Sequence, residues 1–196
     1  ALEADALADI RRTIGLMAAL GRISADDVEP LMQRITIFPL DRAADALGDA
    51  PLIFEGVPEV LGAKERAFAI ACEHAAADAI IASTTSTMMV DELAQFVTGR
   101  GRFLNAHWLN PAFLIPLVEL SVGSETATDV VARLKDILEA VGKVPVVLKA
   151  MPGFVVPRIQ SLAMSEAARA VEDGIASAEE IDKAVVVGLY PIVTFQ

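Results

Sequence analysis

The sequence predicts an α/β fold, with a mostly parallel sheet covered by helices on both faces and an all-helical region after it. Short runs rich in Val, Ile and Leu alternate with segments of helical periodicity, which is typical of a buried parallel sheet. The composition agrees, because 54% of the 196 residues are hydrophobic and only 5% are aromatic. After about Ala150 only helical patterns follow, so a second domain is expected to begin there.

The first part of the chain is expected to be helical, with one short strand at its end. Residues 1–24 carry apolar residues at helical spacing, which favours an amphipathic helix. Ser24, followed by two aspartates, is a suitable N-cap for a second helix that runs to about Arg34. Residues 34–39 include three β-branched residues and a phenylalanine, and they predict a short strand.

Five further apolar runs predict the remaining strands, and the first of them is expected to be buried. The predicted strands lie at residues 51–58, 79–83, 102–108, 117–122 and 144–149. Helical periodicity fills the intervals between several of these strands and the region beyond the last one. The predicted helices lie at residues 59–76, 91–97, 125–142, 151–175 and 177–188.

The charge balance argues against some classes of partner. The formal net charge is -11 at pH 7, which disfavours nucleic acid and anionic membrane surfaces. No apolar run reaches the ~18 residues that span a bilayer, and no cationic leader is visible. Cys72 is the only cysteine, so no intrachain disulfide can form, which fits a reducing compartment. A soluble cytoplasmic protein is the expectation.

Polar residues gather where the predicted strands end. Ligands of open α/β sheets bind outside the carboxyl ends of the strands, and residues 55–59, 83–87 and 107–110 follow three such ends. Glu119 interrupts the apolar residues of the next predicted strand. A buried imidazole or carboxylate persists where it meets a polar partner, so His107 and Glu119 are candidates for a functional pair.

Each of these residues also has a purely structural interpretation. His107 could be a hydrogen-bonded core histidine, and Glu119 an edge-strand residue that faces water. The 83–87 segment could be an ordinary capped turn, and Glu59 and Lys64 could lie on an exposed helix face. The sequence shows neither a metal-ligand constellation nor a glycine-rich phosphate loop, so no metal is predicted.

Taken together, five stretches resemble the L-3-hydroxyacyl-CoA dehydrogenase family. They appear in the family's order and cover nearly the whole chain: FEGVPEVLGAKERAF, IIASTTST, FLNAHWLNPAFLIPLVEL, VGKVPVVLKAMPGFVVPR and EAARAVEDGIASAEEIDKAV. An H-x-x-N-P motif with a glutamate twelve positions after its histidine is a specific combination. The resemblance implies a Rossmann-like NAD-binding domain over residues 1–150. It also implies the beginning of a helical dimerisation domain over residues 151–196, and hence a homodimer.

The resemblance further implies the NAD-dependent oxidation of the 3-hydroxyl group of a 3-hydroxyacyl-CoA. His107 matches the general base, and Glu119 matches the carboxylate that orients the imidazole and stabilises its charged form. Ser86 matches a hydroxyl group that contacts both substrate and cofactor. Asn110 also matches a position at the substrate and cofactor.

Two further residues, Glu59 and Lys64, match positions that line the cofactor site of the family. The family also opens with a strand and a G-x-G-x-x-G turn that hold the pyrophosphate, whereas this sequence begins in the helix after that unit. The N-terminal unit is therefore expected to be missing from the sequence, together with part of the helical domain. Pro157 stands where the family usually has an asparagine near the substrate.

Two other functions stay open at this stage. One is a dehydrogenase of a small free 3-hydroxy acid, as in the related carnitine and gulonate dehydrogenases, because no cluster of Lys and Arg is visible for a coenzyme A tail. The other is a non-catalytic, crystallin-like relative. The intact set of His107, Glu119, Ser86 and Asn110 disfavours the non-catalytic alternative.

Overall fold

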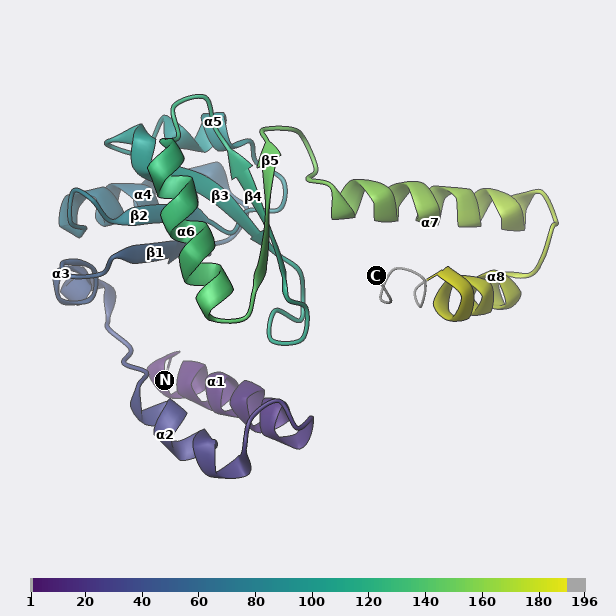
Figure 1. The fold of residues 1–196 in the computed structure, drawn as a ribbon, viewed down its shortest axis with the longest axis horizontal. Helices are drawn as coiled ribbons and strands as arrows, with labels where there is room; N and C mark the ends of the chain where they lie inside the picture. The colour runs from purple at the N-terminus through teal and green to yellow at the C-terminus, as the bar shows by residue number, and fades with distance from the viewer. Residues whose placement is uncertain (1, 190–196) are drawn as a thin grey trace. The chain divides into compact units, whose positions relative to one another are not determined.

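The chain divides into two compact units, residues 1–150 and residues 151–196. The computed structural model describes residues 2–189 (Figure 1). The first unit contains a five-stranded sheet with helices, and the described part of the second unit is helical. The predicted α/β class with a helical region after it is therefore confirmed. The last residues assigned to the helical domain, 190–196, lie outside the described part of the chain.

The sheet has the strand order β1-β2-β3-β4-β5. Its strands are β1 (Leu52–Glu55), β2 (Ile80–Ser83), β3 (Phe103–Trp108), β4 (Leu117–Val122) and β5 (Val144–Lys149). All neighbours are parallel except β3 and β4, because the 109–116 connection is too short for the crossover that a parallel pair needs. The starts of β4 and β5 therefore lie at the same edge as the carboxyl ends of β1, β2 and β3.

Helices cover both faces of the sheet, as predicted (Figure 1). One face carries α6 (Thr128–Ala140), whose Leu134 and Leu138 are buried against strand residues that include Leu104 and Ala106. The other face carries α4 (Leu61–His74) and α5 (Val90–Ala94). Their apolar side chains are buried with Ile81 and Phe103. Because strand side chains alternate between faces, His107 lies on the α4 and α5 face.

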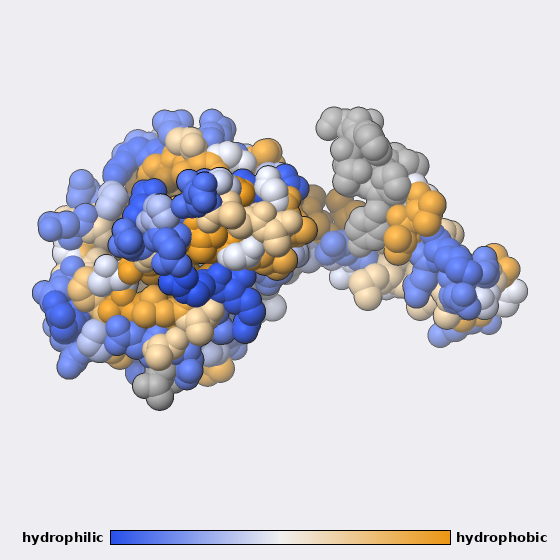
Figure 2. Space-filling model, turned by 90° about the horizontal axis from the view of Figure 1, so that it is seen from below, coloured by the Kyte–Doolittle hydropathy of each residue, from blue (hydrophilic) through white to orange (hydrophobic). Residues whose placement is uncertain are grey.

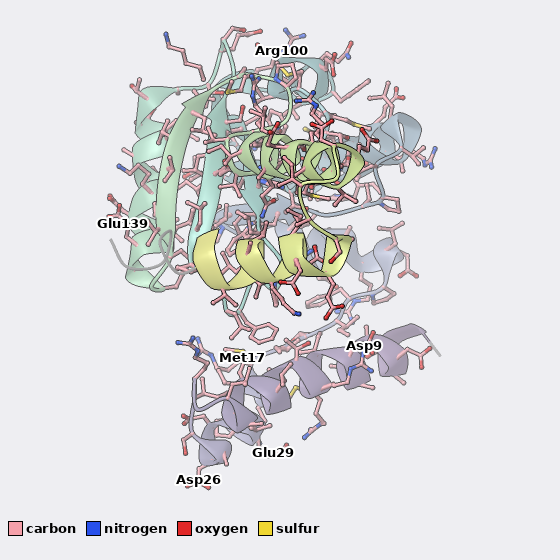
Figure 3. The ribbon with its side chains drawn as sticks, turned by 90° about the vertical axis from the view of Figure 1, so that its right-hand side faces the viewer. Asp9, Met17, Asp26, Glu29, Arg100 and Glu139 are labelled. Carbon is pink, nitrogen blue, oxygen red and sulfur yellow. The ribbon has the colours of Figure 1, made fainter. Side chains whose placement is uncertain are left out.

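The N-terminal segment is a helical hairpin that leads into the sheet. It comprises α1 (Leu2–Ala19), η1 (Ala25–Asp27), α2 (Val28–Gln33), η2 (Leu40–Arg42) and α3 (Ala43–Leu47). Ser24 caps the second helical segment as predicted, because the Asp26 N–H donates to its hydroxyl at 3.3 Å. In Figure 3, Met17 lies on the side of the hairpin towards the rest of the first unit, and Glu29 lies on the far side.

Two local predictions were wrong, and one short helix was missed. Residues 34–39, predicted as a strand, form none, because no strand of the described sheet pairs with them and an extended segment gains ladder hydrogen bonds only from a partner. β1 is an edge strand of the described sheet, so Phe54 is 40% exposed rather than buried. The short helix α3 was not predicted, because a segment of five residues is too short to show a helical period.

The second unit begins with two helices, in agreement with the periodicity of the sequence. These helices are α7 (Val156–Glu172) and α8 (Ala178–Ala184), and the π-helical segment η4 (Val185–Leu189) follows. Pro157 lies in the first turn of α7, where the missing N–H of proline is tolerated. Pro157 therefore stands at the start of this helix without disrupting it.

Candidate active site

A row of polar side chains crosses the sheet at the carboxyl ends of β1 and β2 and continues across β3 and β4. Glu55, Ser83, Asn105 and Ser121 are successive register partners across β1, β2, β3 and β4. All four are at most 6% exposed. Since buried polar groups require partners, this row implies a hydrogen-bonded site on the α4 and α5 face of the sheet.

One step further along β3, His107 is paired directly opposite Glu119 on β4. The imidazole Nδ1 lies 2.9 Å from the carboxylate Oε2, and the two side chains are only 7% and 1% exposed. A carboxylate at Nδ1 favours the tautomer that carries its proton there, which leaves Nε2 as the proton-accepting nitrogen. The structure thus brings together the two residues that the sequence suggested as a pair, in the arrangement of an oriented general base.

A second charged cluster lies at the ends of β1 and β2. The Lys64 ammonium donates to both carboxylate oxygens of Glu55, at 3.0 and 3.1 Å, and the Ser83 hydroxyl donates to Oε2 of Glu55 at 2.6 Å. The Val57 N–H completes the set at 2.7 Å. Lys64 is 1% exposed, so its charge is compensated inside the protein and not by solvent.

Glu59 connects this cluster to the turn after β2. Its Oε1 accepts the Ser86 N–H at 2.6 Å, and the Thr85 hydroxyl donates to the same carboxylate at 2.8 Å. Burial by itself raises the pKa of Glu59, but these hydrogen bonds and the nearby Lys64 charge outweigh it and hold the pKa below its usual range. The Glu59 carboxylate therefore fixes the turn that presents Ser86.

Asn110, the remaining predicted site residue, is exposed in the loop that follows β3. Its peptide bond to Pro111 is cis. Sequence reasoning thus placed His107 and Glu119 in one cluster, and the structure adds that Glu59, Lys64 and Ser86 form another at the same edge of the sheet.

Two buried polar residues were not predicted as part of the site. The sequence places Glu55 in a polar segment but assigns it no function, because its bond to Lys64 depends on how α4 packs on β1. Asn105 donates to the Met88 carbonyl at 3.0 Å, and its Oδ1 has no partner among the described residues. The sequence spacing could have indicated Asn105, because it lies two residues before His107 and residues two apart on a strand share a face.

Pro157 lines a groove of about 410 Å³ on the second unit. Ser161 and Ser165, which follow at helical spacing, line the same groove. The proline itself offers no hydrogen-bond donor. The two serine hydroxyl groups thus offer hydrogen-bond donors and acceptors on the same groove.

Two kinds of feature are absent from the described part of the chain. Within residues 2–189, no helix is both long and apolar enough to cross a membrane. The same residues contain no group of three or more His, Cys, Asp or Glu side chains that could hold a metal ion.

A mostly parallel sheet, with helices on both faces and polar residues at its strand ends, defines a Rossmann-like protein. Residues 2–151 match the family model described as 3-hydroxyacyl-CoA dehydrogenase, NAD binding domain. Residues 153–195 match the model of the 3-hydroxyacyl-CoA dehydrogenase C-terminal domain. The chain belongs to the 3-hydroxyacyl-CoA dehydrogenase family.

Individual relatives differ in the substrates that their names state. The chain is 33% identical to 5-formyl-3-hydroxy-2-methylpyridine 4-carboxylate 5-dehydrogenase of Mesorhizobium japonicum, over 76% of this chain and 48% of the relative. It is 36% identical to L-carnitine dehydrogenase of the same organism, over 71% of this chain and 39% of the relative. The chain thus spans half or less of the length of these curated relatives.

A solved structure of the family superposes on most of the chain. The crystal structure of 3-hydroxybutyryl-CoA dehydrogenase from Escherichia coli K12 gives a TM-score of 0.82 at 30% identity. The match covers 93% of this chain and 38% of that chain. This similarity supports the fold independently of the sequence patterns.

Proposed function

We propose that the full-length protein is an NAD-dependent dehydrogenase that oxidises the 3-hydroxyl group of a 3-hydroxyacyl-CoA to a ketone. The observation that carries the proposal is the buried pair of His107 and Glu119, with 2.9 Å between Nδ1 and Oε2. Family membership supports the reaction class. An imidazole that is oriented by a buried carboxylate is suited to remove a hydroxyl proton.

In the proposed mechanism, His107 accepts the proton of the 3-hydroxyl group at Nε2. The same carbon loses a hydride, so the C–O single bond becomes a carbonyl and both electrons of the C–H bond leave with the hydride. Glu119 accepts the Nδ1–H and stabilises the imidazolium that forms. Acid–base catalysis of this kind contributes ~10²–10⁴ to the rate.

The described residues fit one part of a dinucleotide site. NAD, when bound, accepts the hydride at its nicotinamide ring. A carboxylate near the end of a strand can accept hydrogen bonds from ribose hydroxyls, and Glu59, in the connection between β1 and α4, is partly exposed. We assign Ser86 and Asn110 to substrate and cofactor contacts. Lys64 acts through Glu59, because its buried ammonium lies 3.5 Å from that carboxylate.

A second candidate is the oxidation of a small free 3-hydroxy acid. Two observations favour it: relatives named for L-carnitine and for a pyridine carboxylate, and proline at position 157, where the family usually has a polar asparagine. The chemistry at His107 would be the same. Only the groups that recognise the rest of the substrate would differ.

We propose that residues 151–196 belong to a domain that forms a homodimer. Large apolar side chains of α7 are exposed, among them Ile159 at 62% and Leu162 at 71%. Figure 2 shows hydrophobic surface exposed on both units. Exposed apolar area of this kind is typical of surfaces that bury against a partner. Sedimentation of the full-length protein, compared with an Ile159→Glu variant, measures the oligomeric state.

The test of the enzymatic proposal is His107→Gln in the full-length protein. Turnover of a short 3-hydroxyacyl-CoA with NAD should fall ~10²-fold or more, since a general base is removed. Affinity for NADH, followed by its fluorescence, should persist because Gln keeps the polar surface of the site.

The matched control is His74→Gln, because His74 is the other histidine of the sequence and lies at the end of α4. This control should keep the turnover of the parent protein. If the His107 variant retained more than about a tenth of parental turnover, the assignment of the base would be refuted.

A further inference from the structure

The loop of residues 109–116 joins β3 to β4 and begins two residues after His107. Inside the loop, the Leu114 and Ile115 N–H groups donate to the Pro111 carbonyl at 2.9 and 3.0 Å. These local bonds shape the turn, and the Val144 N–H connects the end of the loop to β5 by donating to the Pro116 carbonyl at 2.9 Å. The position of Asn110 therefore depends on what holds the remaining carbonyl groups of the loop.

One ammonium group contacts this loop at two points. The side chain of Lys143 donates to the Ala112 carbonyl and, at 3.3 Å, to the Ile115 carbonyl. The same Nζ lies 5.5 Å from the centroid of the Trp108 ring. Carbonyl dipoles and the face of an indole both attract positive charge, so the contacts depend on the charge of Lys143 as well as on its length.

The backbone of Lys143 is itself held firmly. Gly142 adopts φ +77° at the end of α6, and the N–H groups of Gly142 and Lys143 donate to the carbonyls of Glu139 and Leu138 at 3.0 and 2.9 Å. This is a Schellman motif, which strongly favours glycine at the left-handed position. β5 begins directly afterwards at Val144, so the lysine projects from the junction of a capped helix and a strand.

We propose that Lys143 is a positioning residue for the reaction. Its charge holds the loop of residues 109–116 and the Trp108 ring, and through them it fixes His107 and Asn110. The catalytic consequence rests on the function proposed above, whereas the anchoring of the loop is independent of it. A displacement of about 1 Å at a reacting group can lower a rate ~10²-fold, so loss of the anchor should be visible in kcat.

The test replaces the ammonium chemically in the full-length protein. Lys143→Cys is introduced in a background without other cysteines, in which Cys72 is replaced by serine. Alkylation with 2-bromoethylamine restores an ammonium group at nearly the original position. Alkylation with iodoacetamide attaches a neutral amide of similar length, and intact mass checks that each reaction is complete.

Two readouts separate anchoring from catalysis. Amide hydrogen exchange over residues 109–116 reports the loop, and kcat reports the reaction. The unmodified and the amide forms should exchange faster in this segment and lose about tenfold or more in kcat. The aminoethylated form should return both readouts to within about threefold of the parent. Lys135→Cys on α6, treated in the same ways, should leave both unchanged.

The proposal is overturned if the neutral amide restores the loop and kcat as well as the ammonium does. It is also overturned if loop exchange is the same in all forms. A parent protein without dehydrogenase activity would instead refute the proposed function, and the exchange measurement would still decide whether Lys143 anchors the loop.

Discussion

His107 and Glu119 occupy directly opposed positions of the antiparallel pair β3–β4, and their Nδ1 and Oε2 atoms lie 2.9 Å apart. The short connection reverses the chain, and this reversal sets the register that brings the glutamate back to the histidine. Side chains of directly opposed residues on one sheet face lie within contact distance. The short connection between β3 and β4 therefore explains both the spacing of the two residues in the sequence and their contact in space.

The first prediction concerns the charge of Glu119. Glu119→Gln should fold as the parent does, because an amide oxygen can still accept the ring N–H. Its kcat should fall by about fivefold or more, since a hydrogen bond to a charged acceptor is worth roughly 1 kcal/mol more than one to a neutral acceptor. Steady-state kinetics give the readout. Glu125→Gln, an exposed carboxylate paired with Arg100, is the control, and an unchanged kcat in the Glu119 variant would contradict the assignment.

The second prediction concerns acid stability. The fold lowers the pKa of Glu59, so this carboxylate contributes stability that is present above the pKa of the unfolded chain and is lost as pH falls through the lowered pKa. The thermal midpoint of the parent should therefore fall more steeply than that of Glu59→Gln as pH drops below 4.5. Glu139→Gln, an exposed residue of α6, should keep the parental slope. Parallel curves for the parent and Glu59→Gln would show that the carboxylate is not stabilised by the fold.

The third prediction concerns the buried ion pair of Lys64 and Glu55. Lys64→Met should lower the free energy of unfolding by about 3–5 kcal/mol, because it leaves a buried carboxylate without its counter-charge. Adding Glu55→Gln should recover part of that loss in a urea titration. Lys183→Met breaks an exposed pair and should change little. A Lys64 variant as stable as the parent would mean that the pair is solvated in solution.

The fourth prediction concerns substrate choice. Pro157→Asn should raise kcat/KM for a short 3-hydroxyacyl-CoA severalfold or more, because an unpaired polar group in a closed site costs about 1–3 kcal/mol. The measurement is a panel of acyl-CoA and free 3-hydroxy acid substrates on both proteins, with circular dichroism to check α7. If the parent already uses acyl-CoA efficiently and the variant is no better, Pro157 serves only to start the helix.

The groove that Pro157 lines suggests a second variant for the same panel of substrates. Ser161 lies on the same groove as Pro157, so Ser161→Ala should lower the activity of the parent if this hydroxyl replaces the asparagine. Ser177→Ala, which removes the N-cap of α8, is a control that deletes a hydroxyl elsewhere in the second unit. Equal kinetics of the parent and Ser161→Ala would exclude the compensation.

Much of the fold was predictable because its elements have strong local patterns. The runs that became β2, β3, β4 and β5 are short and mostly apolar, and α6 carries a clear helical period that ends before Gly142. Residues 35–39 show the limit of this reasoning. They have the composition of a strand, but a strand exists only where a second strand supplies its hydrogen bonds, and composition does not report that partner.

The sequence by itself determined the fold class, the order of the strands along the chain, and the family resemblance that singled out His107 and Glu119. These features depend on local periodicity and on motifs of fixed spacing. Tertiary structure alone decided which carboxylate holds Lys64, because Glu55 and Glu59 are both close in sequence and only the packing of α4 on β1 brings Nζ to 3.0 Å from Glu55. It also decided that Lys143 reaches the loop after His107. Such long-range contacts are set by how helices and strands pack, which no local pattern encodes.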